Sequence, residues 1–306
     1  MAHITVHGGH VLYVGAGGNI GSHAVALLAR SRHVRHLTLV DPDTYTPRNL
    51  ANQAITRGMV GRPKVTVLGE VARAINPTLS LTAHHCAVEE LPLGMLRADL
   101  VLSGVDSRAA RQHVNEVASR LGIPWVDAGV QADGLLARVE RFEPGATTPC
   151  LECSWDDADY AALEQRYPCD GAPHTAPSGS PPALGALVAS MQVLEGERLL
   201  RGDDGGLAPG EQVVLSSAHH RHFRTAHRRN PECRMGDHDR WDIAPLHLGP
   251  GESPAAVLLT IAHLMPCGLD FTWSVFGRHR VRSSTCASCG ASRSRSAWCR
   301  RTRRAH

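Results

Sequence analysis

The feature that most constrains the fold is a glycine cluster between a short apolar run and an amphipathic segment near the N-terminus. Residues 10–14 form the apolar run, and the residues after Asn19 repeat apolar side chains on one helical face. The glycines between them are Gly15, Gly17, Gly18 and Gly21. A glycine turn from strand to helix brings unpaired backbone N–H groups close to an anion. The pattern therefore predicts a bound nucleotide phosphate.

The spacing of these glycines departs from the dinucleotide-binding fingerprint. Counted from Gly15, the sixth position is Ile20, and Gly21 comes one residue late. By itself such a cluster also fits a tight turn in any doubly wound sheet. A second predicted strand, however, ends in Asp41, where an acidic side chain binds ribose hydroxyls in such folds. The first βαβ unit is therefore interpreted as a nucleotide half-site.

Strand and helix patterns alternate through residue 145, which predicts an open parallel sheet with crossover helices. One buried strand ends at Asp106, and the helix that follows has Ser107 as its cap and Gly122 as its stop. The expected fold class is α/β: a doubly wound, mostly parallel, Rossmann-like sheet, plus a smaller zinc-associated C-terminal region.

The residue pattern of the sequence changes at Cys150, where a loop-rich stretch precedes a strong helical pattern over residues 183–202. Beyond it the chain is rich in His, Arg and Gly, with a strand-like stretch near residue 213 and a helical one near 253–265. We predict a nucleotide-binding domain over residues 1–205, including a loop-rich segment at 154–184. Residues 206–306 form the predicted C-terminal module, which ends in an arginine-rich tail.

Composition limits the classes of protein. Hydrophobic residues make up 42%, no apolar run is long enough to span a membrane, and no secretory signal is visible, so a soluble cytoplasmic protein is expected. The net charge of +3 comes largely from the tail, which predicts a solvated segment rather than a nucleic-acid site. Nine cysteines with two Cys-x-x-Cys pairs indicate metal before disulfide.

Several polar residues follow the predicted strands in an order that suits a bound triphosphate. Asp41 can hold the ribose, Lys64 supplies a point charge for phosphate, and Asp106 stands at the carboxyl edge of the sheet, where it can hold Mg²⁺. Arg48, Asn49, Asn52 and Gln53 lie close in sequence. If a helix begins there, Arg48 and Asn52 share a face.

The elements "GAGGNIG", "DPD", "NLANQ", "GRPK", "VDSR" and "CLEC" occur in that order between residues 10 and about 240. Their order and spacing resemble the ThiF/MoeB/HesA-type, E1-like adenylyltransferase family. The resemblance implies attack of a carboxylate on the α-phosphate of ATP, which gives an acyl-adenylate and pyrophosphate. It also implies ATP, Mg²⁺ and Zn²⁺ as cofactors and a homodimer as the assembly.

The resemblance implies site residues by position. Those implied to contact the nucleotide are Gly15, Gly17, Gly18, Gly21, Asp41, Asp43, Asn49, Asn52, Gln53 and Lys64. Those implied to act in catalysis are Arg48, Lys64, Asp106 and Cys169, with Asp106 holding magnesium. The chain departs from the family where Asn52 replaces an arginine. Arg48 takes over that charge, or the protein adenylates slowly or only binds nucleotide.

Zinc ligands are implied by the first Cys-x-x-Cys pair, Cys150 and Cys153, which is incomplete because structural zinc has four N or S ligands. The other two are Cys233 and His238, favoured by spacing, or Cys286 and Cys289, favoured by residue type. We favour the first set, which leaves the last pair for another metal site or for reduced thiols.

The resemblance leaves the acceptor open. It is a ubiquitin-like sulfur carrier or a small peptide, and Cys169 either takes the acyl group or a persulfide, or is a plain loop thiol. Two alternative functions stay possible at this point. One is an NAD-dependent oxidoreductase, which the first βαβ unit permits, and the other is a catalytically degenerate nucleotide-binding scaffold, which Asn52 favours.

Overall fold

The computed structural model describes residues 9–164, 180–236, 238 and 240, and the backbone of 282–285 and 292–295. Several predictions lie outside these residues: Cys169, Cys286, Cys289, the helix near 253–265 and the end of the arginine-rich tail. The chain divides into two compact units, Met1–Val88 with Leu96–Trp241, and Glu89–Met95 with Asp242–His306. Among the described residues, no helix combines the length and hydrophobicity that a membrane span requires.

The first unit is built on an eight-stranded sheet in the order β3-β2-β1-β4-β5-β6-β7-β8. Its strands are β1 (Gly9–Val14), β2 (Val34–Val40), β3 (Ser80–His84), β4 (Leu100–Ser103), β5 (Trp125–Gln131), β6 (Leu136–Phe142), β7 (Glu211–Ser216) and β8 (Arg221–Ala226). The first five pair in parallel, and β6, β7 and β8 add to them antiparallel. In the second unit, β9 (Arg282–Thr285) pairs antiparallel with β10 (Ser292–Arg295).

Ten helical segments are described. The α-helices are α1 (Gly21–Arg30), α2 (Lys64–Ile75), α3 (Arg108–Leu121), α4 (Asp157–Glu164) and α5 (Pro182–Arg201). The 3₁₀ turns are η1 (Pro47–Ala51), η2 (Arg57–Met59), η3 (Val88–Glu90), η4 (Leu93–Leu96) and η5 (Leu151–Ser154).

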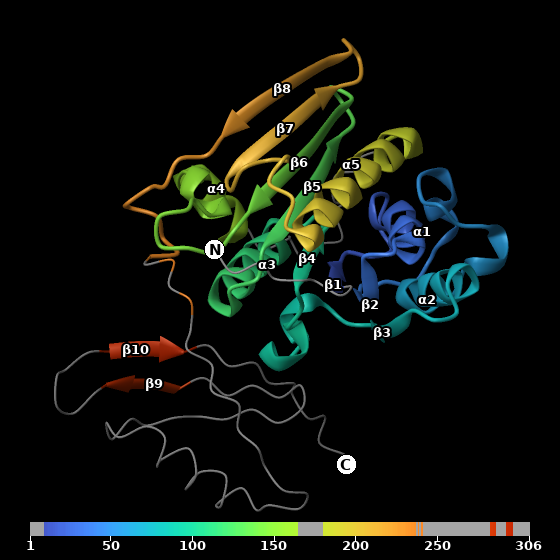
Figure 1. The fold of residues 1–306 in the computed structure, drawn as a ribbon, viewed down its shortest axis with the longest axis horizontal. Coiled ribbons are helices and arrows are strands. Elements are labelled where there is room, and N and C mark those ends of the chain that lie inside the picture. The colour runs from blue at the N-terminus through green and yellow to red at the C-terminus, as the bar shows by residue number, and fades with distance from the viewer. Residues whose placement is uncertain are drawn as a thin grey trace, which may run out of the picture. The chain divides into compact units, whose positions relative to one another are not determined.

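The order of the strands fixes where a ligand can bind. From β1 the chain moves through α1 to β2, whereas from β4 it moves through α3 in the opposite direction to β5. Because such crossovers are right-handed, α1 and α3 cover opposite faces of the sheet. The α1 helix packs against both α2 and α5 (Figure 1). The strand order therefore reverses between β1 and β4, and ligands bind at the carboxyl ends of such strands.

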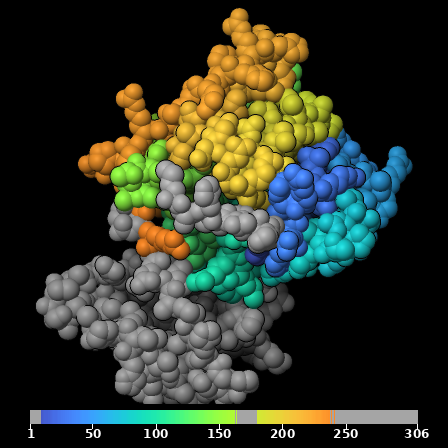
Figure 2. Space-filling model, viewed as in Figure 1, coloured from blue at the N-terminus to red at the C-terminus, as the bar shows by residue number. Residues whose placement is uncertain are grey.

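The predicted fold class is confirmed: the sheet is mostly parallel and doubly wound. The strands β7 and β8 lie past the predicted domain boundary at residue 205, yet they extend this sheet. Leu215 of β7 is buried in the same apolar core as Val188 and Val193 of α5. In the space-filling view, α5 forms a continuous surface between the N-terminal βαβ unit and β7 with β8 (Figure 2). Burial of these apolar faces holds the antiparallel strands on the sheet.

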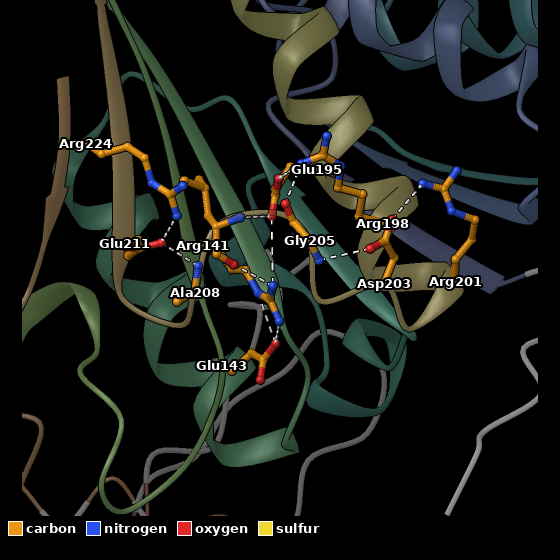
Figure 3. Close-up of polar contacts among 11 residues, drawn as sticks. Arg141, Glu143, Glu195, Arg198, Arg201, Asp203, Gly205, Ala208, Glu211 and Arg224 are labelled. Carbon is orange, nitrogen blue, oxygen red and sulfur yellow. Dashed lines mark hydrogen bonds and ion pairs between the residues drawn. The ribbon is translucent and has the colours of Figure 1, made fainter. Parts of the chain in front are cut away.

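A network of ion pairs joins the end of α5 to the antiparallel strands (Figure 3). Arg141 of β6 is buried, donates to Leu207 O at 2.5 Å, and pairs with Glu143 and, at 3.9 Å, with Glu195 of α5. Glu195 accepts from the backbone N–H of Leu207 at 2.8 Å. The buried charges are thus paired and hydrogen-bonded, as burial requires. This network fixes the connection from α5 to β7.

Candidate functional site

The predicted glycine turn lies between β1 and α1, at the point where the strand order reverses. Gly15 has φ +76°, and a side chain there would meet the Gly104 backbone at 3.0 Å. The backbone N–H of Gly15 donates to Val40 O of β2 at 2.9 Å, and that of Gly18 donates to Gly15 O at 3.2 Å. Only glycine fits this left-handed and closely packed position. The turn thereby lies against the carboxyl ends of the neighbouring strands.

Lys64, the first residue of α2, lies directly over this turn. A Cβ atom on Gly17 would be closer than 3.0 Å to three carbons of the Lys64 side chain, so the contact requires glycine. Lys64 is only 5% exposed, its Nζ lies 2.9 Å from Asp43 Oδ2, and it is 5.8 Å from the centre of the Tyr45 ring. The structure thus places a cation at the glycine turn and holds it there through Asp43.

Asp41 and Asp43 have different environments. Asp41 is 3% exposed and accepts hydrogen bonds from the backbone N–H groups of Gly17, at 2.8 Å, and Asp43, at 3.0 Å. Burial raises the pKa of Asp41, and the nearby Lys64 opposes that rise. The side chain of Asp43, by contrast, is 61% exposed. Asp41 therefore anchors the turn, and Asp43 is the more accessible carboxylate.

The segment with Arg48 and Asn52 corrects one expectation. Its first residues form the five-residue 3₁₀ turn η1 (Pro47–Ala51) rather than an α-helix, and Asn52 ends that turn outside the helical region. A 3₁₀ turn has three residues per turn, so Arg48 and Asn52 do not share a face. Arg48 is exposed.

Unsatisfied polar atoms surround the same region. Within the described part of the chain, Tyr45 Oη, Gln53 Oε1 and Ser103 Oγ are buried without a hydrogen-bond partner. Tyr45 contacts Lys64, and Ser103 ends β4. Buried polar atoms normally have partners, so these three suit a site that a polar ligand or water completes.

Asp106 follows β4 in a short loop and is exposed. The next residue, Ser107, caps α3 by accepting from the Ala110 N–H at 3.3 Å. The backbone of Gly104, in the same loop, lies against Gly15. Asp106 thus stands at the carboxyl edge of β4, next to the strand that leads into the glycine turn.

Cys150, Cys153, Cys233 and His238 come together in a buried cluster from segments more than 80 residues apart. The Cys150 Sγ lies 3.9 Å from Cys153 Sγ and 3.7 Å from Cys233 Sγ, and Cys153 Sγ lies 3.7 Å from His238 Nε2. Tetrahedral zinc with ordinary bond lengths requires about 3.8 Å between sulfurs and about 3.6 Å between sulfur and nitrogen. These three distances suit tetrahedral zinc, and all four ligand atoms lie within 4.8 Å of one another.

The backbone and electrostatics of this cluster support the same fit. His238 has φ +59°, and its Nδ1–H donates to Thr148 O at 3.2 Å, which leaves Nε2 directed at the cysteines. Metal-bound histidines usually make such a second hydrogen bond. Burial raises the pKa of the Cys150 and Cys233 thiols, so a cation is needed to keep them as thiolates.

Two groups of residues were missed by the sequence analysis. Glu152, between the paired cysteines, is 4% exposed and accepts hydrogen bonds from Gln112, Asn115 and Tyr160 at 2.9, 3.1 and 3.0 Å. This carboxylate joins the Cys-x-x-Cys turn to α3. The other group surrounds Asp127, whose charge inside the apolar run "IPWVDAGV" was the available signal.

Comparison with known proteins agrees with this geometry. The model of the ThiF family matches residues 5–235. The sulfur carrier protein ThiS adenylyltransferase of Escherichia coli K12 is 30% identical over 197 residues, which cover 63% of this chain and 72% of that protein. The adenylyltransferase and sulfurtransferase uba4 of Emericella nidulans is 30% identical over 240 residues, 74% of this chain and 47% of that protein.

Solved structures share the fold at lower identity. The crystal structure of E. coli MccB with ATP superimposes with a TM-score of 0.61 at 19% identity, covering 75% of this chain and 66% of that one. The chain spans only part of several curated relatives, for example 37% of ubiquitin-like modifier-activating enzyme 5 of Oryza sativa. With the family model matching from residue 5 to residue 235, the chain belongs to the ThiF family.

Proposed function

We propose that this protein uses ATP and Mg²⁺ to adenylate the C-terminal carboxylate of a ubiquitin-like sulfur carrier or small peptide. A carboxylate oxygen bonds to the α-phosphorus, the bond from that phosphorus to the bridging oxygen breaks, and pyrophosphate leaves. The observation that carries the proposal is Lys64 packed on Gly17 where the strand order reverses. A fixed cation beside backbone N–H groups is suited to the charge that develops on the phosphates.

The composition of the chain adds weight to Lys64. It is the only lysine in the 306 residues, and the other 31 of the 32 Lys and Arg residues are arginines. Lysine offers a compact charge on a flexible stem, which a planar guanidinium does not replace. The presence of lysine at this one position fits a task that needs an ammonium group.

The remaining roles follow from position. Asp106 would hold Mg²⁺ at the carboxyl edge of β4, and Asp41 and Asp43 would face the ribose side of the nucleotide. Asn52 carries no charge, so Arg48, exposed on η1, is the proposed source of an arginine for the leaving phosphates. Cys169 is the proposed acceptor of the activated acyl group.

We also propose zinc as the ion at Cys150, Cys153, Cys233 and His238. All four residues are buried, so the cluster offers no open coordination position of the kind catalytic zinc needs. The ion would supply a crosslink between two chain segments. It takes no part in the chemical step.

The acceptor and the assembly are proposed from the relatives. One relative is named for its sulfur carrier, ThiS, and one structural neighbour is MccB crystallised with MccA. By analogy the acceptor here would be a small protein or peptide with a free C-terminus, and the enzyme would be a homodimer.

The test is ATP–pyrophosphate exchange with the full chain, Mg²⁺, and a panel of sulfur carriers and free-carboxylate peptides. Exchange should depend on one class of acceptor, and Lys64→Ala and Asp106→Ala should each reduce it by about 100-fold or more. Arg62→Ala is the matched control, because Arg62 lies two residues from Lys64 but forms only an exposed ion pair with Glu70. Binding of NAD without ATP, in calorimetry, would contradict the proposal. ATP binding without exchange for any acceptor would favour a scaffold.

A further inference from the structure

Two buried carboxylates face each other across β5 and β6. Asp127 and Glu140 are directly paired in register, and they are 0% and 1% exposed. Arg111 of α3 reaches Asp127, which puts the pair on the sheet face that α3 covers. Directly opposed like charges destabilise a sheet, and buried charges need partners. The neighbouring cations therefore have a structural reason to be there.

Three cationic or titratable groups meet these carboxylates. Arg111 Nε lies 2.8 Å from Asp127 Oδ2, and Arg138 Nη2 lies 3.0 Å from Asp127 and 3.2 Å from Glu140. His227 Nε2 lies 3.0 Å from Glu140 Oε1. The arginine side chains are 14% and 35% exposed, whereas the carboxylates are covered. The carboxylates thus form the buried part of the cluster, and the guanidinium groups form its solvent-facing part.

The two guanidinium groups converge on one point above Gly129, which pairs directly with Arg138. Arg138 Nη2 lies 3.6 Å, and Arg111 Nη2 4.0 Å, from the position that a Cβ atom on Gly129 would occupy. Arg138 Nη2 already pairs with Asp127 and Glu140, and Arg111 Nη2 donates to Val105 O, so a carboxylate bound here would share the two guanidinium groups with these partners. The absence of a side chain at Gly129 keeps that point open to a peptide.

The cluster lies beside the loop that carries Asp106. Arg111 Nη2 donates to Val105 O at 2.5 Å, and Ser103 at the end of β4 pairs with Asp127. A C-terminal segment that approaches this loop from the antiparallel strands passes over Gly129. Its own carboxylate has to go further, to the nucleotide, so the arginines would contact a residue upstream.

The apolar side chain of Phe223 lies in the same cross-strand row of the sheet as Arg138. Arg138 pairs with Val214, and Val214 pairs with Phe223, so all three share a face. Phe223 is 49% exposed. Two strand spacings separate Arg138 from Phe223 by about 10 Å, which an extended peptide covers in about three residues.

We propose that Arg138 and Arg111 bind an acidic side chain in the C-terminal segment of the acceptor. An apolar residue of the acceptor, about three positions further from its C-terminus, then contacts Phe223. This proposal rests on the proposed function and adds a rule for the acceptor's sequence. Arg138 is the specificity residue, because it belongs to β6 and is the more exposed of the two arginines.

The experiment measures binding of a positional-scanning library of labelled octapeptides with free C-terminal carboxylates, in the presence of ATP and Mg²⁺. The native chain should prefer Asp or Glu at one position by about tenfold over Ala, as a partly exposed charge pair provides. Arg138→Gln should remove that preference, measured as the ratio of the affinities for the acidic and the Ala peptide. Arg224→Gln is the matched control, because Arg224 pairs with Glu211 on the opposite side of β7 and β8.

Removal of Arg138 alone leaves two buried acids short of a cation, so the double variant Asp127→Asn with Arg138→Gln keeps the charge balanced. Loss of the acidic preference in either variant supports the proposal. No acidic preference in the native chain, or a preference that survives in both variants, overturns it, as does failure of every peptide to bind. ATP–pyrophosphate exchange is scored separately: a peptide preference without exchange rejects adenylation but leaves this site standing.

Discussion

The proposed nucleotide site and the Cys₃His cluster are built in opposite ways. The first uses turns that directly follow neighbouring parallel strands, so Gly17, Asp41 and Lys64 meet because of strand order. The second joins a Cys-x-x-Cys turn to residues more than 80 positions later, and His238 closes it from a left-handed backbone. The first site is therefore held together by the sheet. The second needs a bound ion, whose binding free energy offsets the entropic cost of closing the long loop between its ligands.

A single helix links the two regions. The loop before α3 carries Asp106, and the middle of α3 holds Glu152 of the Cys-x-x-Cys turn through Gln112 and Asn115. A change in the metal cluster should therefore reach the nucleotide site through α3, while a change in the glycine turn should leave the cluster intact.

Loss of the metal should have the largest effect. Cys233→Ser should abolish stoichiometric zinc and lower Tm by about 10 °C, since structural zinc contributes several kcal/mol. Metal content by plasma mass spectrometry and Tm by calorimetry measure both. Cys86→Ser is the control, a buried cysteine outside the cluster. Full zinc content in Cys233→Ser would contradict the ligand assignment.

Glu152→Ala should come next, with a loss of about 3 kcal/mol in the free energy of unfolding. It leaves the side-chain donors of Gln112, Asn115 and Tyr160 buried without their acceptor. Urea denaturation measures the loss. The exposed Glu70→Ala, which breaks only an ion pair with Arg62, should cost less than about 1 kcal/mol. Equal losses in the two variants would show that Glu152 does not join the turn to α3.

Gly17→Ala should reduce the rate of ATP–pyrophosphate exchange by about 100-fold, which corresponds to about 3 kcal/mol of activation free energy. The zinc content should stay the same. The added methyl group would collide with the Lys64 side chain. Gly58→Ala is the matched control, because a Cβ atom there meets nothing within 4 Å. An unchanged exchange rate in Gly17→Ala would show that the reaction does not depend on the position of Lys64.

The smallest effect concerns acid stability. Burial lowers the pKa of His113 on α3 from 6.5 to about 4, so the folded state disfavours the charged form. The unfolded chain then binds the proton first, and this stability is present above pH 6.5 and is lost between pH 6.5 and about 4. Between pH 7 and pH 5, the free energy of unfolding of His113→Gln should therefore fall by about 2 kcal/mol less than that of the native chain. Urea denaturation at both pH values measures this, and parallel losses would exclude His113 as the cause.

The sequence predicted the parallel half of the fold because strand and helix periods alternate there, and the structure confirms it. It did not predict that β7 and β8 extend this sheet, because the strand-like stretch near residue 213 was placed in the C-terminal module and β8 lies in the His- and Arg-rich region. The glycine turn and Lys64 were readable as local motifs. The contacts of Glu152 and Arg138 were not, because they depend on which strands and helices meet across long separations.

The burial of Lys64 has a consequence under the proposed function, in which the protein would generate activated acyl groups. Acyl-adenylates react readily with amines, and a lysine-rich surface would be labelled by any intermediate that escapes. Here the one ε-amino group in the sequence is 5% exposed and paired with Asp43, and arginine supplies nearly all other cationic side chains. Under the proposed function, the chain would therefore be a poor target for its own acyl-adenylate.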